Sequence, residues 1–418
     1  MKISDVLKES LHMSSPILQN AAALELIQRG LHDVIQVKEL EERASSGPMR
    51  VKLGLDPTAS RVHLGWAVVL RKLRHFQEAG HIAVLVVGDY TAQIGDPTGK
   101  SVTRKRLSAE EVIEHSKLCL EKVTPLLLQD NLEIRFNSEW LRDLPFDEVL
   151  KLMSNATVSQ LLERDDFSNR FRSGKPISLV EFIYPLLQAL DSVQLHADVE
   201  LGGSDQLFNN LMGRALQGAY GQRPQMVCTV PLLVGLDGKE KMSQSLGNDV
   251  AVDDVPNEMF GKLMSIPDDV IIDYCKLAAW MTPDEVENIE AGMANGKIPP
   301  VLAKRAMSRA VVDIYHGSGA GSLAEAAFDR VHVHRTAPAE METRGITSLF
   351  GDQPTLPLAE VVAKVFGVSK SGARRLIDGG GIRLDGIQQF VDSELTRSCL
   401  ENTIVQKGKR SFIRLADD

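Results

Sequence analysis

The sequence predicts an α/β protein with a parallel sheet and more than one folding unit. A strand-like run at 51–55 is followed by an amphipathic stretch at about 64–78 and by the wholly apolar run 82–87. This strand–helix–strand order is the building unit of a parallel sheet. The chain has 418 residues, well above the usual length of one domain. Its last 60 or so residues also differ in charge from the rest.

The elements around these first strands are predicted to be mainly helical. Residues 1–48 predict a helical lead-in, because apolar positions recur at helical spacing up to a breaker of Ser, Gly and Pro. Residues 105–220 also predict mainly helices, the first beginning at Ser108, which forms a capping box with Glu111. A second apolar strand is predicted at 225–234.

The C-terminal half predicts helices, a linker and a small separate domain. Helical periodicity runs from 255 to about 333, where Thr282 before Pro283 marks the start of one helix. Residues 337–356 are irregular and are predicted to be a linker. Residues from Pro357 onward carry a net charge of +2, whereas the remainder carries −11. Positive charge is therefore concentrated in the tail.

Composition argues against several classes of protein. The formal charge of −9 is unlike that of a protein that binds nucleic acid by bulk positive charge. No apolar run is long enough to span a bilayer, and the N-terminal segment is charged where a secretory signal would be apolar. We therefore expect a cytoplasmic protein that is not associated with a membrane. The four cysteines lie far apart and outside Cys-x-x-Cys pairs, so we expect no metal site.

Two polar loops carry residue types that favour phosphate. The first places a turn with Thr58 and His63 after a strand and at the start of a helix, where backbone N–H groups and the helix dipole attract anions. The second has glycines that allow close approach of a ligand, with Lys100 and Arg104 able to receive an anionic leaving group. Either loop alone is explained equally well as a helix entry or a solvated turn.

Two further loops complete the pattern. The loop at 202–206 combines two glycines with a carboxylate and an amide, which suits a ribose or a carboxyl group. The polar loop at 241–248 begins with Lys241, and a mobile loop with a lysine can close over a polyphosphate. A tight turn and a helix-capping loop are the alternative interpretations.

In order and spacing these loops resemble the two signatures of class I aminoacyl-tRNA synthetases, known by the strings HIGH and KMSKS. The signatures stand here as His63-Leu64-Gly65-Trp66 and Lys241-Met242-Ser243-Gln244-Ser245. The stretches Gly-Leu-Asp-Pro-Thr, Ile-Gly-Asp-Pro-Thr-Gly-Lys and Gly-Gly-Ser-Asp-Gln, with the segment 184–191, narrow the resemblance to bacterial tyrosyl-tRNA synthetases. The tail resembles the small RNA-binding domain that many of these enzymes share with a ribosomal protein.

The resemblance implies a domain plan. A Rossmann-type parallel-sheet catalytic domain is expected at 49–248, with a helical dimerisation insertion at about 105–200. An all-helical anticodon-recognition domain is expected at 249–336, and a small α+β RNA-binding domain at 357–418. The family's dimers make contact through the insertion, so a homodimer is expected.

The resemblance also implies an activity and a set of site residues. Such a ligase joins L-tyrosine to ATP, giving tyrosyl-adenylate and pyrophosphate, and passes tyrosine to tRNA(Tyr), with Mg²⁺ accompanying the nucleotide. The expected catalytic residues are Thr58, His63, Lys100, Arg104 and Lys241. The expected substrate-binding residues are Lys52, Asp56, Asp96, Tyr184, Gln188, Asp191 and Gln206, of which Asp191 would accept the phenolic hydroxyl. The expected ATP-binding residues are Gly54, His63, Gly65, Trp66, Gly203, Asp205, Met242 and Ser243, and the expected RNA-binding residues are Lys370, Arg374 and Arg375.

Three positions depart from the family pattern. Trp66 stands where the first signature usually ends in His, Gln244 where the second has its second Lys, and Lys52 where many relatives have Tyr. Two alternative functions therefore stay open. One is a paralogue with altered amino-acid specificity or weakened ATP use, serving secondary metabolism or resistance, and the other is a non-catalytic RNA-binding homologue.

Overall fold

The computed structural model describes residues 20–57, 61–94, 107–332, 341–351, 353–408 and 411–417. The chain divides into two compact units, Met1–Ser318 and Gly319–Asp418. Among the described residues, no helix is long and apolar enough to cross a bilayer.

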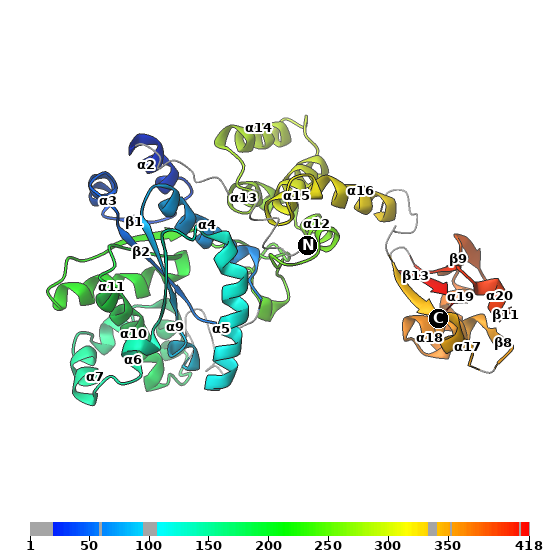
Figure 1. The fold of residues 1–418 in the computed structure, drawn as a ribbon, viewed down its shortest axis with the longest axis horizontal. Coiled ribbons are helices and arrows are strands. Elements are labelled where there is room, and N and C mark those ends of the chain that lie inside the picture. The colour runs from blue at the N-terminus through cyan, green and yellow to red at the C-terminus, as the bar shows by residue number, and fades with distance from the viewer. Residues whose placement is uncertain are drawn as a thin grey trace. The chain divides into compact units, whose positions relative to one another are not determined.

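A six-stranded sheet forms the centre of the first unit (Figure 1). Its spatial order is β1 (Val34–Ile35), β6 (Met226–Val230), β5 (Val199–Gly203), β2 (Arg50–Leu55), β3 (Ile82–Val87) and β4 (Leu132–Phe136). Neighbours pair in parallel, except that β1 runs antiparallel to β6. Parallel strands are covered on both faces, which explains why β3 and β6 consist of apolar and small residues that are almost all buried.

The sheet changes its direction of growth between β2 and β5. From β2 the chain adds β3 and β4 on one side, whereas β5 and β6 extend the sheet on the other. At such a point the loops that leave the carboxyl ends of the two strands diverge and open a crevice, where ligands of open α/β sheets bind. Asp56 follows β2 and Ser204 follows β5, so the polar loops of the sequence meet at this crevice.

Helices cover both faces of the sheet and continue into a helical region after it. Helix α4 covers one face, and α10 with α11 covers the other (Figure 1). The helices before residue 220 are α2 (Asn20–Gln28), α3 (Val37–Ala44), α4 (Leu64–Glu78), α5 (Ala109–Val123), α6 (Ser138–Leu141), α7 (Phe146–Met153), α8 (Val158–Leu161), α9 (Asp165–Arg172), α10 (Leu179–Leu195) and α11 (Leu207–Ala219). Those after it are α12 (Pro256–Leu263), α13 (Ile271–Leu277), α14 (Pro283–Ala294), α15 (Pro300–His316) and, in the second unit, α16 (Ala320–His332).

Local sequence signals place two helix starts correctly. Ser108 caps α5, because its hydroxyl accepts the N–H of Glu111 at 3.1 Å while the Glu111 carboxylate accepts the N–H of Ser108 at 2.7 Å. Thr282 forms the same reciprocal pair with Glu285 at the start of α14. Both capping boxes satisfy N–H groups that a helix start otherwise leaves unpaired.

The prediction of mainly helices over 105–220 is confirmed in the described part of that segment, but it missed two strands. Strand β4 is an edge strand whose residues are all half-buried, so it lacks the continuous apolar run that marks a buried strand. Strand β5 contains Glu200 and two glycines, which are rare in strands. Strand β6 ends at Val230 rather than at 234, because the chain leaves the sheet at Pro231.

The second unit contains a five-stranded sheet in the order β10-β9-β12-β13-β7 and a two-stranded sheet of β11 and β8. The strands are β7 (Glu342–Gly345), β8 (Thr355–Pro357), β9 (Ile382–Leu384), β10 (Ile387–Gln389), β11 (Glu394–Thr396), β12 (Ile404–Lys407) and β13 (Ser411–Ala416). The helices that accompany them are α17 (Ile346–Phe350), α18 (Leu358–Phe366), α19 (Lys370–Asp378) and α20 (Arg397–Leu400).

The expected linker at 337–356 differs from the structure in its described part. Strand β7 pairs in parallel with β13, and Leu349 and Phe350 of α17 are buried in the core of this unit. Strand β7, with the sequence Glu-Thr-Arg-Gly, is too short and polar to be recognised from its pattern. The small C-terminal domain therefore begins earlier in the chain than the sequence indicated.

Candidate active site

A cavity of about 680 Å³ lies at the crevice between β2 and β5, within the usual size range of small-molecule sites. It is lined by residues from the carboxyl ends of β2, β5 and β6, from α4 and α10, and from the loop at 241–245. Fourteen of the predicted site residues line it: Gly54, Asp56, His63, Gly65, Trp66, Tyr184, Gln188, Asp191, Gly203, Asp205, Gln206, Lys241, Met242 and Ser243. The predicted Thr58, Asp96, Lys100 and Arg104 lie outside the described residues.

Asp56 and Tyr184 form one side of the cavity. The Tyr184 hydroxyl donates to Asp56 Oδ2 at 2.7 Å, and the Thr91 hydroxyl donates to Asp56 Oδ1 at 2.9 Å. This arrangement requires a glycine beside it, because a Cβ on Gly88 would lie 1.9 Å from Asp56 Oδ1. Gly88 and Thr91 are functional candidates that the sequence reasoning missed; a glycine directly after a buried strand was the available signal.

Asp191 is buried in the wall of the cavity, with 4% of its surface exposed. Trp140 Nε1 donates to its Oδ1 at 2.9 Å. Burial raises the pKa of Asp191 to about 7, although the charge of Lys52 and hydrogen bonds from Trp140 and Asn137 oppose that rise. The group therefore titrates near neutral pH, where its charge decides how strongly it accepts a hydrogen bond.

Lys52 does not line the cavity, contrary to its prediction as a substrate-binding residue. Its side chain is fully buried, and its Nζ donates to Ser192 Oγ at 2.7 Å and to the backbone oxygen of Gln188 at 2.9 Å. It also forms an ion pair with Glu200 Oε1 at 2.9 Å. Three acceptors thus use the three N–H groups of the ammonium, which leaves none for a substrate.

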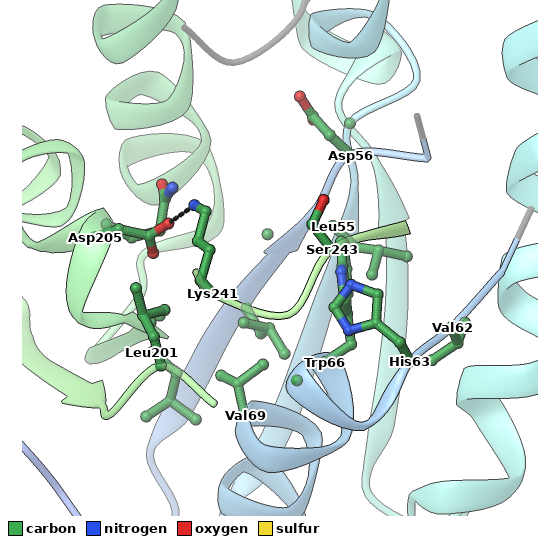
Figure 2. A pocket seen from close by; sticks show the side chains of 18 of the residues that line it. Leu55, Asp56, Val62, His63, Trp66, Val69, Leu201, Asp205, Lys241 and Ser243 are labelled. Carbon is green, nitrogen blue, oxygen red and sulfur yellow. Dashed lines mark hydrogen bonds and ion pairs between the residues drawn. The ribbon is translucent and has the colours of Figure 1, made fainter. Parts of the chain in front are cut away.

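His63 is the N-cap residue directly before helix α4 and faces the cavity (Figure 2). Burial lowers the pKa of His63 to about 4, so the imidazole is neutral at physiological pH. Its Nδ1 is buried and has no hydrogen-bond partner among the described residues. A Cβ on Gly65 would lie only 3.0 Å from that nitrogen, so the glycine of the signature gives the ring its space.

Lys241 and Asp205 pair across the cavity (Figure 2). The Nζ of Lys241 donates to Asp205 Oδ2 at 2.5 Å, joining the loop at 241–245 to the loop after β5. Gln244 also lines the cavity, and its Oε1 is buried without a hydrogen-bond partner in the described part of the chain. The cation expected to meet phosphates and the carboxylate expected to meet a ribose therefore neutralise each other in this structure.

Apolar side chains complete the lining. They include Leu55, Val69, Leu201 and Leu232, which come from four different elements or loops. The sequence reasoning missed them as site residues, because their pattern does not differ from that of ordinary core residues. Such a lining suits a flat aromatic or purine ring once polar groups have fixed its orientation.

The three predicted RNA-binding residues lie on α19 in the second unit. All three are exposed; Lys370 Nζ lies 2.7 Å from Glu360 Oε2, and Arg374 Nε lies 3.2 Å from Asp392 Oδ2. The strands β9 and β10, which follow α19 in the chain, form an antiparallel hairpin with Asp385 and Gly386 in its turn at positive φ. The helix therefore presents positive charge at the surface of a folded unit.

The sequence matches the family model described as tRNA synthetases class I (W and Y) over residues 44–332. A tyrosine–tRNA ligase of Moorella thermoacetica is 42% identical over 400 residues, covering 94% of this chain and 96% of that one. The chain belongs to the tyrosine–tRNA ligase family of class I tRNA synthetases. The tyrosine–tRNA ligase of Chlorobium luteolum is likewise 42% identical, over 97% of this chain and 99% of its own. The family and fold class that the motifs predicted are thus confirmed.

Solved structures agree on the fold of this tyrosine–tRNA ligase family member. The tyrosyl-tRNA synthetase of Archaeoglobus fulgidus, complexed with L-tyrosine, aligns with a TM-score of 0.61 at 24% identity. The alignment covers 73% of this chain and 99% of that one. The synthetase of Aeropyrum pernix aligns with a TM-score of 0.60 at 18% identity, over 75% of this chain and 98% of that one.

We predict that Gly88→Ala destabilises the protein by on the order of 1–3 kcal/mol, because the new methyl group must displace the Asp56 carboxylate or the Thr91 hydroxyl. Thermal unfolding measures the effect. Gly261→Ala is the matched control, since a Cβ there meets nothing within 4 Å and alanine favours the helix. Equal unfolding temperatures for wild type and Gly88→Ala would contradict the close packing around Asp56.

We predict that Asp191→Asn makes the protein more stable at neutral pH. The pKa of Asp191 rises on folding from 3.8 to about 7, so wild-type stability falls as the pH rises from about 4 to about 7. Asparagine carries no charge to bury and removes this loss, which is on the order of a few kcal/mol. Chemical unfolding at pH 4.5 and pH 8 compares the two proteins. A stability difference that is the same at both pH values would contradict the prediction.

Proposed function

We propose that this protein is a tyrosine–tRNA ligase that activates L-tyrosine with ATP and transfers the tyrosyl group to tRNA(Tyr). The observation that carries the proposal is the meeting of both signature loops and Asp191 in one cavity. Membership of the family supports the same activity. ATP is the co-substrate, and Mg²⁺ would be bound chiefly by the phosphate oxygens of the nucleotide.

The activation step needs positioning and charge stabilisation rather than a covalent enzyme intermediate. An oxygen of the tyrosine carboxylate attacks the α-phosphorus, the bond from that phosphorus to the bridging oxygen breaks, and pyrophosphate leaves with the electron pair. His63 is neutral and can donate an N–H to a phosphate oxygen. Lys241, with Thr58, Lys100 and Arg104, would stabilise the charge that develops on the phosphates.

Amino-acid selection is assigned to α10. Tyr184, Gln188 and Asp191 all line the cavity from this helix, because spacings of four and three residues place them on one face. Gln188, together with Asp96 and Tyr184, would hold the α-ammonium group. Asp191 would accept the phenolic hydroxyl, and phenylalanine would leave this buried group unpaired, which disfavours phenylalanine strongly.

The transfer step requires contacts with tRNA beyond the cavity. The 3′-terminal hydroxyl of tRNA attacks the carbonyl of the adenylate and releases AMP. Lys370, Arg374 and Arg375 on α19 are proposed to meet RNA phosphates, which would reconcile an acidic chain with an RNA partner. A cytoplasmic location would follow from this role.

A homodimer is proposed on the basis of exposed apolar side chains in the helical insertion. The exposed fractions are 74% for Phe146, 61% for Val158, 65% for Phe171 and 79% for Leu179. These residues belong to α7, α8, α9 and α10, within the segment expected to carry the dimer contact. Exposed apolar side chains of this size commonly mark a protein interface where they form one patch. Sedimentation velocity measures the oligomeric state directly.

We predict tyrosine-dependent exchange of pyrophosphate into ATP, followed by charging of tRNA(Tyr). Lys241→Ala should lower the exchange rate by about a hundredfold, because it removes a charge that stabilises the leaving group. Lys297→Ala is the control, since this exposed lysine does not line the cavity. Absence of tyrosine-dependent exchange at any protein concentration would refute the proposed function, and saturable RNA binding without ATP turnover would favour the non-catalytic alternative.

A second candidate, a paralogue with altered amino-acid use or weakened ATP use, is favoured by Trp66 and Gln244, which both line the cavity. We predict that Gln244→Lys, alone or with Trp66→His, raises the exchange rate with tyrosine by about tenfold or more, because it adds a cation facing the pyrophosphate. The control is Leu246→Ser, a substitution at an exposed position two residues further along the chain. Faster exchange with a tyrosine analogue than with tyrosine would select the paralogue, whereas unchanged rates would show that the charge is already compensated.

A further inference from the structure

A buried ion pair lies beneath the amino-acid side of the cavity. Lys52 on β2 and Glu200 on β5 are direct register partners in the sheet, and both side chains are buried. Burying two opposite charges is unfavourable unless each is paired and fully hydrogen-bonded.

The pair meets that condition through a closed network. Glu200 Oε1 accepts from Gln188 Nε2 at 3.1 Å, and its Oε2 accepts from the Ser192 hydroxyl at 3.0 Å and from Gln225 Nε2. Helix α11 approaches so closely that a Cβ on Gly213 would lie 2.9 Å from Glu200 Oε2. The side chains around the pair are thus held in one arrangement.

This network reaches two of the three proposed tyrosine contacts on α10, Gln188 and Asp191. Lys52 binds the backbone oxygen of Gln188, and Glu200 binds its side-chain amide, so Gln188 is held at two points. Lys52 also favours the ionised form of Asp191, whereas Glu200 disfavours it, and the effect of Lys52 is the larger. Neither charged residue touches a ligand itself, because neither lines the cavity.

We propose that Lys52 and Glu200 are positioning residues of the amino-acid site: the pair orients Gln188 and favours the ionised form of Asp191 for the phenolic hydroxyl of tyrosine. The proposal rests on the proposed function. An ionised carboxylate accepts a stronger hydrogen bond than a neutral one, so a protein with ionised Asp191 discriminates better between tyrosine and phenylalanine. The charged groups that act on Asp191 are Lys52 and Glu200, and its hydrogen-bond donors are Trp140 and Asn137.

The test uses the pH dependence of kcat/KM for tyrosine in pyrophosphate exchange. In the wild-type protein, kcat/KM for tyrosine should rise as the pH passes through about 7, because Asp191 ionises there. The preference for tyrosine over phenylalanine should rise over the same pH range. The double variant Lys52→Met with Glu200→Gln leaves no charge unpaired. It should move the midpoint upward by about one pH unit, because the larger effect of Lys52 is lost. Glu200→Gln alone should move the midpoint downward.

The matched control is a second buried ion pair, Arg170 with Glu181, neither of which lines the cavity. Arg170→Met with Glu181→Gln should lower the unfolding temperature without moving the midpoint. A purely structural role for Lys52 and Glu200 would lower kcat/KM at every pH and leave the midpoint in place. An unchanged midpoint in the folded double variant, or an equal shift in the control, overturns the proposal.

Failure of the proposed function is distinguishable from failure of this inference. If wild type shows no tyrosine-dependent exchange, the proposed function fails, and the titration of Asp191 is then followed by ¹³C NMR of labelled aspartate carboxyl groups. Asp191→Asn identifies the signal. An upward shift of that titration in the double variant still supports control of Asp191 by the pair, and an unchanged titration refutes it.

Discussion

The pairing of β2 with β5 is the constraint on which the site depends. Five strands of the sheet run in parallel, so their carboxyl ends lie at one edge, and the change of direction between these two strands opens the crevice there. The chain then supplies one signature at the start of α4, the helix that follows β2, and the Gly-Gly-Ser-Asp-Gln loop at the end of β5. A slip of one residue in this pairing would turn every side chain of one strand to the opposite face. Lys52 and Glu200, as register partners of opposite charge, disfavour such a slip.

Electrostatics inside the site follow from burial more than from net charge. Desolvation lowers the pKa of His63 and raises the pKa of Asp191, so burial favours the neutral form of both the base and the acid. A neutral imidazole can donate a hydrogen bond to a phosphate without a counter-ion. The protonation state of a carboxyl group that titrates near pH 7 changes with small changes in nearby charge or hydrogen bonding. The overall charge of −9 carries no information about these two residues.

The sequence predicted the parts of the fold whose signals are local. Helix α4 and strand β3 have strong periodicity, and the caps at Ser108 and Thr282 are set by neighbouring residues. Strands β4, β5 and β7 could not be found in this way, because pairing with a neighbour stabilises them rather than their own composition. In the site, the sequence motifs predicted most of the polar residues that line the cavity. They misplaced Lys52, because its distance from the cavity is set by Ser192 and Glu200, which are far away in the sequence.

In the proposed function, in which Asp205 meets the ribose and Lys241 the phosphates, the ion pair between these two residues would couple the two ends of a nucleotide. A ribose that binds Asp205 would then have to displace the lysine, and a polyphosphate that recruits Lys241 would have to free the carboxylate. A ligand that carries both groups breaks the pair once and gains both contacts, whereas a nucleoside or free pyrophosphate has to break the pair for one contact only. Binding of the two halves would therefore be cooperative, and whole nucleotides would be favoured over their fragments by more than the sum of the separate affinities.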